Sequence, residues 1–255
     1  MWDFTKQYGL EVIVNGVSVV EYPHTDGNTY VEGRPGSNYL LRISNNSYEE
    51  ILAIPAIDGL SVFDGKEAGP DSAGYVIGAQ VTIDVPGWTL NNNAVGKFEF
   101  GAITSSYSAQ SNKGTSNVGV IGLMIFRPKP IVARQSNQNS ILHGQIFGSS
   151  AVASRDWLET SCDALISTQE MGTGFGDVQQ FNTVKTTFEK RDSNNPDAII
   201  AMYYDSARGL EKRGIRIGVK HNPTPFPTYT KTMESNNNPL LAIKGCTPPP
   251  NWVKK

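Results

Sequence analysis

Residues 30–69 read YVEGRPGSNYLLRISNNSYEEILAIPAIDGLSVFDGKEAG and residues 74–100 read GYVIGAQVTIDVPGWTLNNNAVGKFEF, and this stretch decides the fold class. Its short apolar or alternating segments are separated by Gly, Asn and Asp clusters roughly every eight to twelve residues. No segment keeps a helical period for long. The stretch therefore predicts antiparallel strands joined by tight turns.

Two segments carry the clearest strand signals. Leu10–Glu21 holds two apolar runs around Asn15-Gly16, a dipeptide that readily takes positive φ angles and so favours a type I′ hairpin. Tyr39–Ile43 reads YLLRI, and its first, third and fifth residues share one face of a strand. We expect that face in the core and Arg42 on the water side.

Two further runs are more apolar. Ile51–Ile57 contains Pro55, which cannot donate to a sheet ladder, so this strand is expected at an edge or a bulge. Val118–Phe126 is the most apolar run of the chain and predicts a central strand buried on both faces. A buried helix is the weaker alternative, because Gly119 and Gly122 would both lower helix stability.

The remaining segments are weaker in pattern. The small polar residues of Thr104–Asn117 predict a loop, and Arg155–Ile166 is compatible with one short helix. The sequence predicts two helical turns over Ser206–Arg213, ended by Gly214, and strands over Val184–Phe188, Ala198–Tyr204 and Ile215–Val219.

Two segments lack periodicity and are expected to be extended. Residues 127–170 form an inserted arm that begins with Pro128 and Pro130, and residues 221–255 form a Pro-rich C-terminal tail. We expect residues 1–220 to be a single β-sandwich domain. The predicted fold is thus all-β, an antiparallel β-sandwich of jelly-roll type with a long inserted arm and an irregular tail.

Composition narrows the function classes. The 255 residues include 25 Gly and 15 Pro and only 18% charged residues, which suits short strands and tight turns. A net charge of −2 argues against direct, sequence-specific nucleic-acid binding, which usually needs a basic surface. The N-terminus MWDFTKQYGL is not typical of a secretory signal, and no run predicts a transmembrane segment.

Metal and redox chemistry is not indicated. Cys162 and Cys246 lie far apart, which favours two free thiols in a reducing compartment and leaves a single bridge as the alternative. His24, His143 and His221 are scattered without the spacing of zinc ligands. We therefore expect no cofactor and no metal.

Two polar clusters invite a binding interpretation. Asp58, Asp64, Glu67 and Asp71 could offer oxygens to calcium, but their spacing does not fit an EF-hand and Asp-Gly is a usual turn dipeptide. Gly172–Gly176 (GTGFG) lacks the spacing of a phosphate-binding loop, and we expect a turn with positive φ and close backbone approach there.

Catalytic and sugar-binding signals are equally sparse. No G-x-S-x-G elbow occurs and Cys162 has no catalytic signature around it, so an enzyme is disfavoured. Several aromatic residues could stack on sugars, but aromatics of a sandwich core are the favoured interpretation: Tyr75, Trp88, Tyr107, Tyr203 and Tyr204.

A set of short motifs carries a resemblance over about residues 10–217. The motifs are YVEGR (30–34), DGLSV (58–62), DG (64–65), GY (74–75), GW (87–88), GVIG (119–122), GTGFG (172–176), YYD (203–205) and RGI (213–215). Together they resemble an uncharacterised family of β-rich proteins encoded in bacterial genomes and their viruses. The resemblance implies a virion protein, assembled in the host cytoplasm, and no established activity.

The first functional hypothesis is therefore a structural protein of a phage particle, a capsid or capsid-associated subunit that contacts copies of itself and other virion proteins. The arm and tail would gain order on a neighbour, with Pro128, Pro130, Phe226, Pro227 and Tyr229 as subunit contacts. The alternatives are a carbohydrate-binding or adhesive module and, less favoured, a jelly-roll enzyme.

Overall fold

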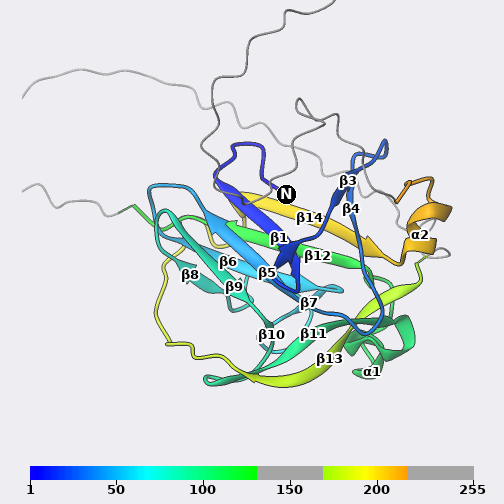
Figure 1. Cartoon of the computed structure of the whole chain (residues 1–255). Coiled ribbons are helices and arrows are strands. Elements are labelled where there is room, and N and C mark those ends of the chain that lie inside the picture. The colour runs from blue at the N-terminus through cyan, green and yellow to red at the C-terminus, as the bar shows by residue number, and fades with distance from the viewer. Residues whose placement is uncertain (131–168, 218–255) are drawn as a thin grey trace, which may run out of the picture. The chain divides into compact units, whose positions relative to one another are not determined.

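The computed structural model describes residues 1–130 and 169–217, which belong to one compact unit, Met1–Ile217 (Figure 1). The described strands form two sheets that share one hydrophobic core. Leu41 and Phe98 of the first sheet and Ile57, Ile121 and Met202 of the second belong to the same buried cluster. This confirms the predicted all-β sandwich. The predicted helix in the arm and the tail from residue 221 onward lie outside the described residues.

The first sheet has the strand order β10-β11-β5-β1-β2, with β13 beside β11 and β9 beside β5. Its strands are β1 (Tyr8–Val14), β2 (Val17–Ser18), β5 (Asn38–Asn45), β9 (Val81–Val85), β10 (Gly87–Asn91), β11 (Ala94–Ala102) and β13 (Met171–Gln180). All pairs in it are antiparallel.

The second sheet has the order β3-β4-β14-β12-β6-β7, with β8 also beside β6. Its strands are β3 (Glu21–Pro23), β4 (Thr29–Glu32), β6 (Ile51–Ile57), β7 (Leu60–Ser61), β8 (Tyr75–Ile77), β12 (Val120–Phe126) and β14 (Ala198–Asp205). The β14–β4 pair is parallel, so this sheet is mixed and not purely antiparallel as predicted. The jelly-roll connectivity is not confirmed.

The two clearest strand signals are confirmed. Asn15 and Gly16 have φ angles of 51° and 78° and join β1 to β2, as a type I′ turn requires. In β5, Tyr39, Leu41 and Ile43 are buried. Arg42 lies on the other face and pairs with Asp84 of β9 at 2.8 and 2.9 Å.

The prediction that Pro55 lies on an edge strand is wrong, because β6 is inside the sheet, but the backbone of Pro55 itself is unpaired on one side. β6 lies between β12 and the two short strands β7 and β8. β8 pairs with residues 51–53 and β7 with residues 56–57, so Pro55 falls in the gap between them, where no N–H is needed. β12 is central as predicted, between β14 and β6, but alternate residues on it are only partly buried.

The predictions for the helices were right in one place and wrong in another. α2 (Ala207–Lys212) is capped by Ser206, whose hydroxyl accepts from the Gly209 N–H at 3.0 Å, and Gly214 follows at φ 80°. The predicted loop over residues 104–117 instead contains η1 (Ile103–Ser105) and α1 (Tyr107–Gln110), because Ser106 caps α1. No strand forms over residues 184–188 or over the described residues 215–217.

Candidate functional site

The predicted subunit contacts lie at the point where the described backbone breaks off. Pro128 forms an isolated bridge with Lys190, and Pro130 is exposed at the rim of a wide depression that also includes Glu49, Arg127 and Glu189. Ion pairs dominate this surface, such as the one from Arg127 to Glu49 at 2.8 Å. The other three predicted contacts, Phe226, Pro227 and Tyr229, lie outside the described residues.

A buried polar network joins the two sheets. Tyr39 of β5 and Tyr204 of β14 each hydrogen-bond the Thr173 hydroxyl of β13 at 2.7 Å. The Tyr204 hydroxyl also donates to Asp58 Oδ1 at 2.6 Å. Asp58 lies in the turn between β6 and β7 and is 2% exposed. The network therefore connects four segments that are far apart in the sequence.

Backbone donors complete the shell around the Asp58 carboxylate. The Gly119 N–H donates to Oδ1 and the Thr173 N–H to Oδ2, each at 2.9 Å. Burial raises the Asp58 pKa to about 6, although these hydrogen bonds oppose the rise. Because the side chains are enclosed, the network stabilises the packing of the sheets and does not reach a ligand. The Asp58-Gly59 dipeptide signalled the turn correctly, but nothing in it signalled that the carboxylate points inward.

The GTGFG segment is not the turn that its sequence predicts. Gly172–Gly176 lies inside β13, paired with β11, and its glycines do not have positive φ. The expected close approach is confirmed: a Cβ on Gly172 would meet Ser106 Cβ at 2.6 Å, and one on Gly174 would meet the Ser105 carbonyl at 3.2 Å. Glycine is therefore needed here for space and not for an unusual backbone angle.

The outer edge of β13 is the most unusual surface of the described chain. β13 pairs with β11 along one side and with no other described strand. Phe98 and Phe100 of β11 direct their N–H groups away from β13, to Pro86 and Ser37. In an antiparallel ladder their partners on β13 then direct their own backbone groups outward. By the register, Phe175 and Val178 present outward N–H and C=O groups.

The other strands at sheet edges are protected. β2, β3, β7, β8, β9 and β10 are only two to five residues long, and β3 contains Pro23 and Glu21. β13 has ten residues and, from Phe175 to Gln180, one charge, no lysine and no proline. A bulge at Gly176–Asp177 is its one protective device. In Figure 1 β13 runs along the lower border of the molecule.

Apolar side chains lie beside this edge. Phe175 is 41% exposed and Val178 is 68% exposed. The register places them on the same face as Phe98 of β11, which lies directly opposite Phe175 and is fully buried. The Phe175 ring covers Gly96 and lies 5.7 Å from the ring of Tyr107. The core-facing side of β13 thus becomes solvent-exposed toward its C-terminal end.

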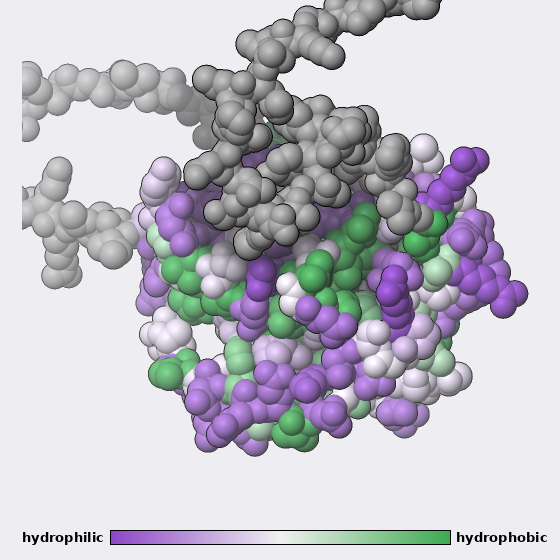
Figure 2. Space-filling view, viewed as in Figure 1, coloured by the Kyte–Doolittle hydropathy of each residue, from purple (hydrophilic) through white to green (hydrophobic). Residues whose placement is uncertain are grey.

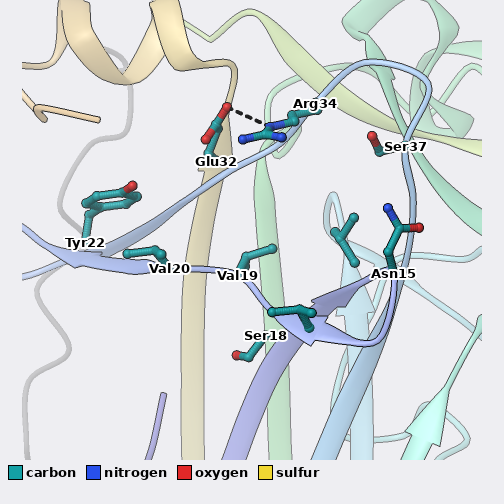
Figure 3. Close-up of a pocket in the computed structure, with 10 residues that line it drawn as sticks. Asn15, Ser18, Val19, Val20, Tyr22, Glu32, Arg34 and Ser37 are labelled. Carbon is teal, nitrogen blue, oxygen red and sulfur yellow. Dashed lines mark hydrogen bonds and ion pairs between the residues drawn. The ribbon is translucent and has the colours of Figure 1, made fainter. Parts of the chain in front are cut away.

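A second apolar surface is a groove of about 290 Å³ at the corner where the chain passes from β2 to β3 (Figure 3). Four valines line it: Val14, Val17, Val19 and Val20. The Glu32–Arg34 ion pair, at 3.1 Å, closes one side. Figure 2 shows hydrophobic residues gathered across the middle of this face. The strands beside the groove are the short, protected β2 and β3, so it offers side-chain contacts without a backbone ladder.

The predicted aromatic set divides into two groups. Trp88, Tyr75 and Tyr204 are buried in the core, as favoured, whereas Tyr107 and Tyr203 are partly exposed. Within residues 1–130 and 169–217, no group of three or more His, Cys, Asp and Glu side chains could hold a metal ion. In the same ranges, no helix is long and apolar enough to cross a membrane. Cys162 and Cys246 lie outside the described residues.

Comparison of the chain with protein-family models, with curated proteins and with solved structures gives no match in any of the three.

Proposed function

We propose that this protein is a structural subunit of a virus particle, which acts by associating with further copies of itself and with other particle proteins and not by catalysis. The supporting observation is the outer edge of β13, with which no other described strand pairs. A long edge strand with outward backbone groups is a template for pairing with another strand. Natural proteins block such edges unless they use them, and the other described edge strands are blocked.

The edge is suited to pair with the same strand of a second copy. In an antiparallel pair centred on Val178, Asp177 would lie opposite Gln179 and Gly176 opposite Gln180. No like charges would then face each other. Such a pair would also bring the two exposed valines together and cover apolar surface that the described chain leaves in water.

Size-exclusion chromatography with light scattering, followed by electron microscopy, tests this function. We expect the full chain to form oligomers in a concentration-dependent manner, and microscopy to show closed shells or regular arrays. A chain that stays monomeric at its highest soluble concentration would overturn the proposal. Disordered aggregates would do the same.

The variant Val178→Pro tests the role of the edge. Because the Val178 N–H points away from β11, proline should leave the β11 ladder intact but remove a donor that pairing needs. We expect a folded protein that no longer associates. The matched control is Val184→Pro, at an exposed valine beyond the end of β13. If the wild type assembles and V178P assembles equally well, assembly stands but the β13 edge is not its contact.

A further inference from the structure

A cavity of about 190 Å³ lies beside the N-terminal end of β12, between the loop before that strand and the C-terminal end of α2. Its apolar wall is formed by Ile103, Val118 and Val120 and by the tyrosines Tyr30 and Tyr203. Its volume equals that of about six waters in the liquid, which is the size class of one sugar ring. The cavity adjoins the start of β13, but none of the edge residues Phe175–Gln180 lines it, so binding here is independent of the proposed association.

Arg213 supplies the charge in this cavity. Its side chain is 11% exposed, and its Nη2 donates to Gln169 Oε1 at 3.3 Å. The nearest carboxylate oxygen to its Nε is Asp205 Oδ2, at 3.8 Å, which is too long for a hydrogen bond. Arg213 therefore forms an ion pair with Asp205 and lies over the Tyr30 ring at 5.7 Å, but its bond to Gln169 is the one hydrogen bond of its side chain among the described residues.

The Asp205 carboxylate is held in place by other groups. Its Oδ1 accepts from the Glu170 N–H at 3.0 Å and from the Ser206 N–H at 2.8 Å. A Cβ on Gly209 would meet this carboxylate within 2.3 to 2.5 Å, so the side chain fills the space that glycine leaves. Asp205 consequently holds the Nε side of Arg213 in an ion pair, and a ligand carboxylate would have to use the Nη groups.

The remaining lining groups are neutral and polar. Asn117 brings a carboxamide, and Thr115 and Ser116 bring hydroxyls, while no carboxylate lines the cavity. The Gln169 carboxamide also lines it, but it already donates to the Met171 and Tyr204 carbonyls and accepts from Arg213. A guanidinium matches the two oxygens of a carboxylate, and carboxamides and hydroxyls match ligand hydroxyl groups. The tyrosine rings, 5.5 Å apart, give an apolar surface for the face of a ring.

We propose that this cavity binds a hydroxylated carboxylate the size of one sugar ring, a hexuronic acid, with its carboxylate on Arg213. The ring hydroxyls lie toward Asn117 and the Thr115–Ser116 loop, and the ring face lies against the tyrosine wall. The protein is in this respect a binder of acidic sugar units, a narrower class than a general sugar-binding module.

Isothermal titration calorimetry of the full chain tests the site with three probes. Galacturonate carries both features, galactose lacks the carboxylate, and acetate lacks the hydroxylated ring. We expect galacturonate to bind with a Kd of about 1 mM or tighter, and the other two to bind at least about ten-fold more weakly. No heat with galacturonate, or equal affinity for galactose, would overturn the proposal. Equal affinity for acetate would show that Arg213 binds any carboxylate and would overturn the assignment to a sugar acid.

Two variants locate the binding. Arg213→Gln should abolish galacturonate binding, whereas Arg216→Gln, the same change at an exposed arginine nearby, should leave it unchanged. R213Q also removes the ion pair with buried Asp205 and so affects stability as well as binding, and Ser116→Trp therefore provides an independent test. Ser116 is exposed on the loop, and tryptophan there should fill the cavity and abolish binding without a change in Tm. Retained affinity in R213Q or in folded S116W contradicts the site.

Discussion

Replacement of Asp58 by asparagine should change how the stability of this protein depends on pH. Asp58 is buried in the network between the sheets, and burial raises its pKa to about 6 from an ordinary value of 3.8. Asparagine has a similar shape and tolerates the positive φ of 54° at this position, but it does not titrate. The hydroxyl bonds from Thr173 to Tyr39 and to Tyr204 can run in either direction, so the network can also accept a protonated Asp58.

The magnitude follows from the two pKa values. A carboxyl group whose pKa is higher in the folded state binds more protons there, so its stabilising contribution is complete below about pH 4 and is lost as the pH rises through about 6. At about 1.4 kcal/mol per pH unit, the interval from 3.8 to about 6 amounts to about 3 kcal/mol. The free energy of unfolding of the wild type relative to D58N should therefore fall by about 2–3 kcal/mol between pH 4 and pH 7.

Urea unfolding, followed by tryptophan fluorescence at several pH values, measures this difference. Subtracting the D58N value from the wild-type value at each pH cancels the titration of all other groups. It also removes any pH-independent loss of stability in D58N, whose side-chain NH₂ would face the Thr173 N–H. Asp64→Asn is the control, because Asp64 lies in a similar but exposed Asp-Gly turn. Burial raises its pKa, but hydrogen bonds from Lys66 outweigh this and lower the pKa overall. D64N should show a small effect of opposite sign. A wild-type–D58N difference that stays constant from pH 4 to pH 7 would refute the reasoning.

Two further substitutions test the packing around these carboxylates. Tyr204→Phe removes the hydroxyl that donates to Asp58, so it should lower the free energy of unfolding by about 1–2 kcal/mol. It should also raise the Asp58 pKa and so move the pH-dependent loss of stability to higher pH. If urea unfolding shows this loss at the same pH as in the wild type, the prediction is contradicted. Gly209→Ala should lower the free energy of unfolding by about 1–3 kcal/mol, because its Cβ would overlap the Asp205 carboxylate. Gly69→Ala has open space around it and should change the free energy of unfolding by less than about 0.5 kcal/mol. Equal effects of the two variants in urea unfolding would contradict the close approach at Gly209.

Local signals in the sequence were sufficient wherever the structure depends on neighbours along the chain. Asn15-Gly16 fixes a hairpin because its own backbone angles do so, and the alternation in Tyr39–Ile43 gives the buried face of β5. Ser206 and Gly214 mark both ends of α2 for the same reason. These features need no knowledge of what packs against them.

The sequence failed where the reason for a residue lies elsewhere in the fold. Gly172–Gly176 forms a strand without a strand-like pattern, because Ser105 and Ser106 occupy the space that side chains would fill. The aspartate of an ordinary Asp-Gly turn is exposed, but Asp58 is buried because its partners Thr173 and Tyr204 come from strands more than a hundred residues away. The cavity beside Arg213 likewise depends on segments that the sequence does not relate to each other.

The two ends of β13 have different roles: Thr173 belongs to the buried network, and Phe175–Gln180 form the outer edge with which no other described strand pairs. Thr173 directs its N–H to the same side as Phe175 and Val178, but that N–H already donates to Asp58. A partner strand can therefore pair only from Phe175 to Gln180, which is the length of an average strand. Stability and association should then be separable: D58N acts on the network and leaves the edge in place, whereas V178P removes an edge donor and leaves the network in place. A D58N protein that still associates at pH 7, beside a V178P protein that is stable but monomeric, is the pattern that this division requires.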